Sequence, residues 1–213
     1  YSSKSRNSIR HLNEFTRLDF ELTYADTQSA KETLVEAINH IIEAVTHQCA
    51  SELELLGITL KEQKSIPEIT YDDAMVLLAK DKTQLSLDPT DEKKLCEYSQ
   101  SKFNSDYIFV TNLPSENRPF YEKENCGFVL LSNGLEIASG GEHISDYTEQ
   151  VQKLKKSGYD CADYESFLSA HKFALPQICG AGIGLERFLM ALLNLDNIRS
   201  AALFTRDLHY LTP

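Results

Sequence analysis

The chain has 213 residues, 42% of them apolar, which is enough for one large or two small packed domains. Its 32 acidic and 21 basic residues give a net charge of −11. Such a surface repels a phosphate backbone, so the composition disfavours broad nucleic-acid binding by this chain alone. No apolar run has the length of a transmembrane helix, and we expect no membrane association.

Cysteine usage indicates the compartment. The five cysteines are an odd number, widely spaced and without a CxxC pair, which predicts reduced thiols in a cytoplasmic protein and argues against a disulfide framework or a zinc site. Because the first residue is Tyr1 and not Met, we expect the chain to be a fragment or an excised domain.

Hydrophobic periodicity predicts one strand and then helices in the first half of the chain. Residues 16–26 alternate as a strand does, with Leu18 and Phe20 on one face. Ser29 and Glu32 have the spacing of a capping box, which predicts the start of a long amphipathic helix in a region ending near Gly57. Two further helices are predicted over 72–80 and 91–102.

The second half contains a hairpin signal. Two strand-like runs flank a Ser132-Asn133-Gly134 turn, after a buried strand at 107–111. Helices are predicted over 146–157, 162–170 and 184–194, and a short strand over 201–204. Hairpin strands with helices inserted between them predict an α+β fold, an antiparallel sheet flanked by helices.

The stretch GAGIGLERFLM, residues 180–190, has alternating glycines that let a backbone or a ligand approach a strand closely. Arg187 follows one turn into a predicted helix, where its guanidinium can reach an anion. The alternative is a helix packed tightly on a sheet, with Arg187 in a salt bridge. The spacing does not fit a P-loop.

Two other segments carry polar groups suited to a site. RHLNEFTRLDFEL, residues 10–22, collects cations, an imidazole, an aromatic ring and carboxylates at the head of a strand. NGLEIASGG, residues 133–141, places Glu136 on a strand where a carboxylate can meet a metal or a ribose. The alternative for Glu136 is an outward-facing strand carboxylate.

Together these segments resemble the catalytic domain of class II aminoacyl-tRNA synthetases of the aspartyl/asparaginyl group, the archaeal and eukaryotic aspartyl type most of all. RHLNEF with LDFEL resembles the distal part of motif 2, and GAGIGLERFLMALLNLDNIRSAALFTRD resembles motif 3. The resemblance covers residues 1–213 as one catalytic domain. It implies that ATP and an amino acid react to give an aminoacyl-adenylate, with Mg²⁺ as cofactor.

The resemblance also implies roles for residues around ATP. Phe15 matches the residue that stacks on adenine, and Arg187 matches the arginine on the phosphates. Arg10 and His11 fall near the β and γ phosphates, and Glu136 matches a carboxylate that holds magnesium. The glycines that end at Gly184 are expected to form the floor under ATP.

On the amino-acid side, Asp19 matches a carboxylate suited to the substrate ammonium, and Gly140 and His143 fall in the same pocket. Several positions depart from the family pattern. Ser2 replaces the arginine that contacts the α-phosphate, and Val129 replaces an aspartate that shares the metal. His143 replaces the arginine that binds the aspartate side chain, which places aspartate specificity in question.

Three functions fit this pattern. The first is activation of aspartate or asparagine for ligation to tRNA. tRNA binding would need the N-terminal anticodon-binding domain that, like motif 1, this sequence lacks, and the full-length protein would be a homodimer. The second is an asparagine-synthetase-like amide ligase acting on a non-tRNA acceptor. The third is a catalytically impaired binding or regulatory module.

Overall fold

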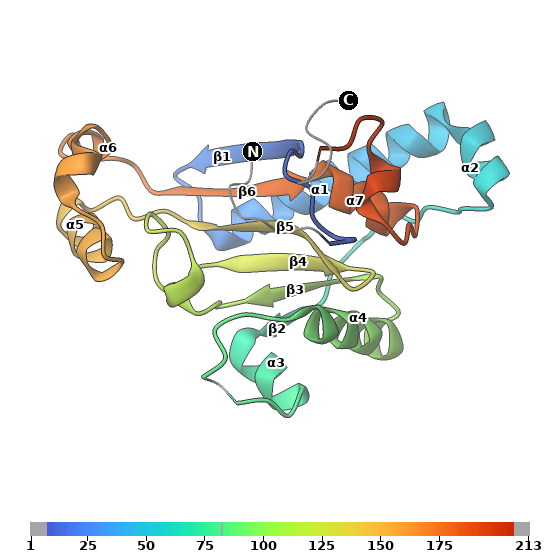
Figure 1. Cartoon of the computed structure of the whole chain (residues 1–213), viewed down its shortest axis with the longest axis horizontal. Coiled ribbons are helices and arrows are strands. Elements are labelled where there is room, and N and C mark those ends of the chain that lie inside the picture. The colour runs from blue at the N-terminus through green and yellow to red at the C-terminus, as the bar shows by residue number, and fades with distance from the viewer. Residues whose placement is uncertain (1–7, 82, 207–213) are drawn as a thin grey trace.

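The computed structural model describes residues 8–81 and 83–206 of the chain. Within these residues, six strands form one sheet in the order β1-β6-β5-β4-β3-β2 (Figure 1). All neighbouring strands are antiparallel except β2 and β3, which are parallel. The strands are β1 (Arg17–Thr23), β2 (Glu68–Thr70), β3 (Tyr107–Thr111), β4 (Phe128–Ser132), β5 (Leu135–Glu142) and β6 (Ile178–Gly184).

Helices lie around this sheet. The long α1 runs along it, α3 and α4 lie beside β2 and β3, and α5 and α6 form a lobe at one end (Figure 1). The helices are α1 (Thr27–Gln48), α2 (Ala50–Leu56), α3 (Tyr71–Leu77), α4 (Pro89–Phe103), α5 (Tyr147–Lys156), α6 (Glu165–His171) and α7 (Leu185–Leu192). Short 3₁₀ turns span Ser115–Asn117, Cys161–Tyr164 and Ile198–Ala201.

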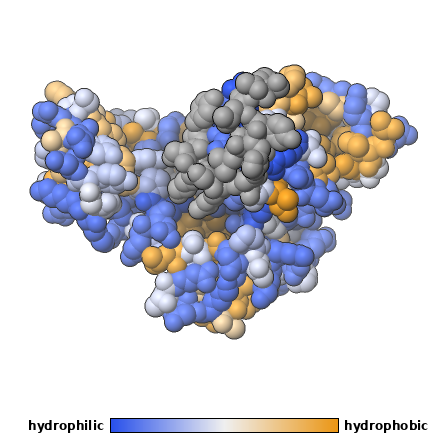
Figure 2. Space-filling view, in the orientation of Figure 1, coloured by the Kyte–Doolittle hydropathy of each residue, from blue (hydrophilic) through white to orange (hydrophobic). Residues whose placement is uncertain are grey.

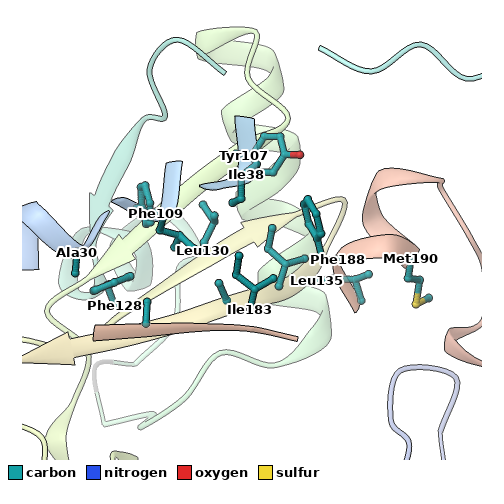
Figure 3. Packing of buried hydrophobic residues seen from close by; sticks show 14 of the residues in the cluster. Ala30, Ile38, Tyr107, Phe109, Phe128, Leu130, Leu135, Ile183, Phe188 and Met190 are labelled. Carbon is teal, nitrogen blue, oxygen red and sulfur yellow. The ribbon is translucent and has the colours of Figure 1, made fainter. Parts of the chain in front are cut away.

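The main core lies between α1 and one face of the sheet. Strand residues alternate between faces, so Phe128 and Leu130 point to this side together with Ala181 and Ile183 of β6. Figure 3 shows Phe128 and Leu130 near Ala30 and Ile38 of α1, with Phe188 and Met190 of α7 at one end of the cluster. The apolar stripe of α1 that meets them consists of Ala30, Leu34, Ile38 and Ile42.

The opposite face of the sheet changes character from one edge to the other. One row of paired residues runs across it, in the order Asp19, Gly182, Ser139, Val129 and Val110. The last two are buried in a second apolar cluster beneath α3 and α4. Asp19 is exposed, and only glycine and serine stand between. This face is therefore closed by helices at β3 and β4 and has short side chains at β5 and β6.

The predicted fold class is confirmed: the domain is α+β, with one largely antiparallel sheet flanked by helices. The helix start at Ser29 was wrong. Asp26 is the N-cap of α1 because its carboxylate accepts a hydrogen bond from the Ser29 backbone N–H at 2.9 Å. The helix region does end at Gly57, which adopts a left-handed φ of 66°.

The predicted strand at 201–204 was also wrong. The Asn197 side chain accepts a hydrogen bond from the Arg199 backbone N–H and starts a 3₁₀ turn instead. Ile198 is buried, and its N–H donates to the carbonyl of Ile9, so this segment packs against an N-terminal loop and does not extend the sheet. The parallel strand β2 was not predicted, since three residues carry too little pattern.

Apolar side chains also gather on the surface. In the orientation of Figure 2 a hydrophobic patch lies at the upper right, over the region of α2. The α2 residues Leu55 and Leu56 are 86% and 58% exposed. Contiguous exposed apolar surface of this kind is typical of protein contact sites. Among the described residues, no helix is long and apolar enough to span a membrane.

Gly140 provides a test of the packing between β5 and β6. A Cβ at this position would lie 2.3 Å from the Gly180 carbonyl oxygen and 2.6 Å from Cζ of Phe128. Because a backbone oxygen and a core ring cannot both yield, we expect Gly140→Ala to lower the free energy of unfolding by about 2 kcal/mol or more. Urea denaturation measures this change.

Gly184→Ala is the matched control, because a Cβ there meets only the Ile137 oxygen at 4.0 Å. We expect its unfolding midpoint to stay close to that of the wild type. Equal destabilisation by the two alanines would contradict the packing described for Gly140.

Candidate functional site

A pocket of about 270 Å³ opens where the loop of residues 8–15 meets β5, β6 and the start of α7. It combines three arginines, two glutamates, a histidine and an aromatic ring with glycines of β6. All six residues that the sequence assigned to ATP line it: Arg10, His11, Phe15, Glu136, Gly184 and Arg187. The structure therefore brings together residues that are up to 177 positions apart.

Arg187 joins two walls of this pocket. Its Nε donates to the Arg10 carbonyl and its Nη1 to the Glu136 carbonyl, each at 3.2 Å. The side chain thus spans from α7 to both the loop and β5. A guanidinium has five N–H donors in a fixed plane, so one held in this way presents a preorganised positive charge to the pocket.

Glu186 has a structural role that the sequence did not reveal. It is 9% exposed, and its two carboxylate oxygens accept the Thr16 backbone N–H at 2.9 and 3.0 Å. The Leu185 N–H in turn donates to the Thr16 carbonyl at 2.9 Å. These bonds fix the residue between Phe15 and β1 to the start of α7. In the sequence, only its position next to Arg187 pointed to a role for Glu186.

The loop of residues 8–15 is held from its other side by the C-terminal segment. The Asn13 N–H donates to the Arg206 carbonyl at 3.1 Å, and Arg206 pairs with Glu14 at 3.0 Å. Leu12 is 5% exposed and joins the main core. His11 Nδ1 lies 2.7 Å from the Ser8 hydroxyl, which orients its ring within the loop.

Arg10 forms an ion pair with Glu92 of α4, a residue outside the segments that the sequence singled out. The two side chains are 13% and 10% exposed. Burial raises the pKa of the Glu92 carboxyl, while the hydrogen bond and charge of Arg10 act to lower it. Glu136 and Arg187 also affect this pKa, so charges from four segments meet beside the pocket.

Two glycines of β6 lie beneath charged side chains of β1. A Cβ on Gly182 would lie 2.0 Å from Asp19 Oδ1 and 2.2 Å from Arg17 Nη2. A Cβ on Gly180 would lie 2.2 Å from Glu21 Oε2. The missing side chains therefore make room for the polar groups of β1, and Arg17 and Asp19 form an exposed ion pair at 3.0 Å.

The three residues assigned to the amino acid, Asp19, Gly140 and His143, do not line this pocket. His143 Nε2 is 3.6 Å from Glu21 Oε2, and its ring packs on Tyr121 with centroids 4.9 Å apart. Asp19 lies between the two regions, paired with Arg17. Gly140 directs its missing side chain at the core, while its carbonyl accepts a hydrogen bond from Arg118 at 3.1 Å.

Arg118 belongs to a second buried pair beside His143. Its Nε and Nη2 donate to the two oxygens of Glu122, both at 2.7 Å, in the forked geometry that guanidinium and carboxylate favour. Gly127 and Gly141 give this pair its space, because a Cβ on either would meet the Glu122 carboxyl within 3 Å. Arg118 and Glu122 thus form a fixed charge pair beside His143.

The donors available to a metal are few. Among residues 8–81 and 83–206 there is no group of three or more His, Cys, Asp or Glu side chains that could hold an ion. Val129 is 5% exposed and packs in the apolar cluster, so it adds no donor beside Glu136. One carboxylate fits a Mg²⁺ that takes its other ligands from water and phosphate, and does not fit a cage built by the protein alone. Ser2, another departure from the family pattern, lies outside the described residues.

Comparisons with known proteins agree with this geometry. Residues 4–208 match the family described as tRNA synthetases class II (D, K and N). An aspartate–tRNA(Asp/Asn) ligase of Thermus thermophilus is 34% identical over 99% of the chain and 52% of its own length. An aspartate–tRNA(Asp) ligase of Thermoplasma acidophilum is 32% identical over all of the chain and 51% of its own length. The chain thus spans about half the length of these relatives.

Solved structures show the same fold. Aspartyl-tRNA synthetase from Entamoeba histolytica superposes with a TM-score of 0.91 at 25% identity, over all of this chain and 47% of that one. Asparaginyl-tRNA synthetase from Pyrococcus horikoshii, solved with asparaginyl-adenylate, superposes with a TM-score of 0.89 at 26% identity, over 99% and 51%.

The burial of Val129 predicts the result of restoring an acid there. Val129→Asp would place a carboxylate among the side chains of Ile108, Val110 and Leu131. We expect a loss of unfolding free energy of about 3 kcal/mol at neutral pH, since the charged form is desolvated. Burial raises the pKa of such a carboxyl, so the loss should be smallest below about pH 4, where the acid is protonated, and grow as the pH rises.

Chemical denaturation at pH 4 and pH 7 measures both effects. Val129→Thr, which preserves the branched shape without a charge, is the control and should show no comparable pH dependence. An aspartate variant as stable as wild type at neutral pH would mean that this position is open to the site.

Proposed function

Because the chain belongs to the class II tRNA synthetases of the D, K and N group, we propose that it activates aspartate or asparagine with ATP, for ligation to tRNA by the protein of which it is part. The observation that carries this proposal is the pocket where Arg10, Phe15, Glu136 and Arg187 meet. An aromatic ring suits the base of a nucleoside triphosphate, two guanidinium groups suit its phosphates, and a carboxylate suits the Mg²⁺ bound to them.

In the activation step a carboxylate oxygen of the amino acid attacks the α-phosphorus of ATP. A new P–O bond forms, the bond to the β-phosphate oxygen breaks, and pyrophosphate leaves. The protein's part in this reaction is positioning and charge stabilisation. Arg187 supplies a fixed positive charge to the phosphates, and Phe15, which is 39% exposed beside the pocket, offers a face for the adenine.

Glu136 is proposed to hold Mg²⁺ together with phosphate oxygens. Bound there, the ion would neutralise negative charge on the phosphates. Arg10 and His11 are proposed to contact the β and γ phosphates from the loop, and Gly184 leaves open space at the floor because no atom lies within 4 Å of its absent side chain except the Ile137 oxygen at 4.0 Å.

The amino acid is proposed to bind over β6, between Asp19 and His143. Asp19 suits the substrate ammonium. His143 lies beside the Glu21 carboxylate, so the side-chain end of the proposed amino-acid site has an imidazole and an acid where the family pattern has an arginine. This arrangement accommodates a carboxamide as well as a carboxylate, so both asparagine and aspartate are proposed substrates.

Partners follow from the same assignment. We propose that tRNA binds only to a longer protein that carries an anticodon-binding domain, and that this protein is a homodimer. The exposed apolar surface of α2 is of the kind that oligomers bury. All five cysteines are free, which suits the cytoplasm. The amide ligase and the non-catalytic module are not favoured, because the relatives are named as tRNA ligases.

Amino-acid-dependent ATP–pyrophosphate exchange, measured across the twenty amino acids, tests this function. We expect exchange with aspartate, asparagine or both. Exchange with another amino acid alone would contradict the proposed specificity and assign His143 a different substrate. A folded protein that gives no exchange with any amino acid would contradict the proposed activity.

Arg187→Ala provides the residue-level prediction. Loss of one preorganised donor to the phosphates should lower kcat/KM for exchange by about 10²- to 10³-fold. Lys155→Ala, on the exposed side of α5 and away from the pocket, should leave the rate within about twofold. A similar fall in both variants would assign the effect to general damage.

A further inference from the structure

The guanidinium of Arg10 is fixed by a residue from a distant part of the chain. Its Nη2 donates to Glu92 Oε2, across 82 positions of sequence. The Arg10 carbonyl is also engaged, by Arg187 Nε at 3.2 Å. Both ends of this residue are therefore tied, one to α4 and the other to α7, while its side chain lines the pocket.

The helix that carries Glu92 begins at a rigid point. Asp88 accepts the Asp91 N–H at 3.0 Å and the Asp91 side chain accepts the Asp88 N–H at 3.0 Å, a capping box with Pro89 in the first turn. Lys80 joins both carboxylates, at 2.6 and 2.7 Å. Glu92 is the next residue after this cluster, so it is a fixed partner for the Arg10 side chain of the loop of residues 8–15.

Glu92 is a buried acid beside a pocket that we propose binds a polyanion, so its position needs a physical explanation. On electrostatic grounds alone, Glu92 works against phosphate binding, because its charge opposes those of Arg10 and Arg187. A flexible arginine, however, loses much rotamer freedom when it binds a ligand. Fixing its guanidinium in advance lowers that cost, which is the general basis of preorganisation.

We propose that Glu92 is a positioning residue for nucleotide binding: it acts through Arg10, holding the guanidinium in place for the phosphate end of ATP. This inference rests on the proposed function of the pocket. Of the five N–H donors of this guanidinium, the bond to Glu92 engages only Nη2, and the side chain still lines the pocket. The pairing therefore leaves Arg10 with donor capacity for a second anion.

A double-mutant cycle on the chain tests the coupling. The measurement is the Kd of MgATP by calorimetry for wild type, Arg10→Met, Glu92→Gln and the double variant. We expect Glu92→Gln to raise the Kd about tenfold in the wild-type background and to have no further effect once Arg10 is Met. AMP, which lacks the β and γ phosphates, should bind wild type and Glu92→Gln alike.

Glu97→Gln, an exposed acid on the same helix, is the matched control and should leave the Kd unchanged. The inference would be overturned if the two single-variant increases in Kd multiplied in the double variant, or if Glu92→Gln weakened AMP binding as much as ATP binding. Tighter ATP binding by Glu92→Gln would also overturn it, because Glu92 would then compete with the phosphates for Arg10. Wild type that binds no ATP would overturn the proposed function, and this inference with it.

Thermal unfolding separates binding from stability. Arg10→Met leaves the buried Glu92 without its partner and should lower the Tm, whereas the double variant should recover part of that loss. A Glu92→Gln variant whose Tm falls while its Kd for ATP does not change would show a purely structural role and overturn the inference.

Discussion

The contact between the Glu186 carboxylate and the Thr16 backbone N–H holds together the segments that make the pocket. A hydrogen bond to a charged group contributes about 1.5–3 kcal/mol. Its larger consequence is geometric, because Thr16 lies between Phe15 and β1 and Glu186 lies beside Arg187. With this contact in place, a ring from the loop and a guanidinium from α7 face the same space.

The sheet adds a second constraint, since one of its faces serves two purposes. Toward β3 and β4 it is apolar and covered by α3 and α4, and Val129 belongs to that part. Toward β6 and β1 it presents glycines beneath Asp19 and Glu21. The change from valine to glycine along one row of paired residues sets the border between core and site, and it explains why Glu136 has no acidic neighbour from β4.

Much of this domain was predictable from local patterns. The apolar run at 107–111 and the Ser132-Asn133-Gly134 turn predicted β3, β4 and β5, and the apolar periodicity beyond Ser29 predicted α1. Errors arose where a non-local bond decided the outcome. The segment 201–204 has strand-like residues, yet the preceding turn is tied to Ile9 and does not join the sheet.

The lobe of α5 and α6 is held by Phe120, whose ring meets Tyr159, Tyr164 and Phe167 at 5.0–5.5 Å between ring centroids.

Short motifs in the sequence were enough to identify the family and the fold class, and to select the residues that we propose bind ATP, because residue type and spacing carry this information. Only the tertiary structure decided how those residues are held. Glu92 and Glu186 contact partners 82 and 170 positions away, and no periodicity records such pairs. It also decided that His143 lies beside Glu21 and that Val129 belongs to the core. Strand register and helix packing place side chains against one another, and these are properties of the whole sheet.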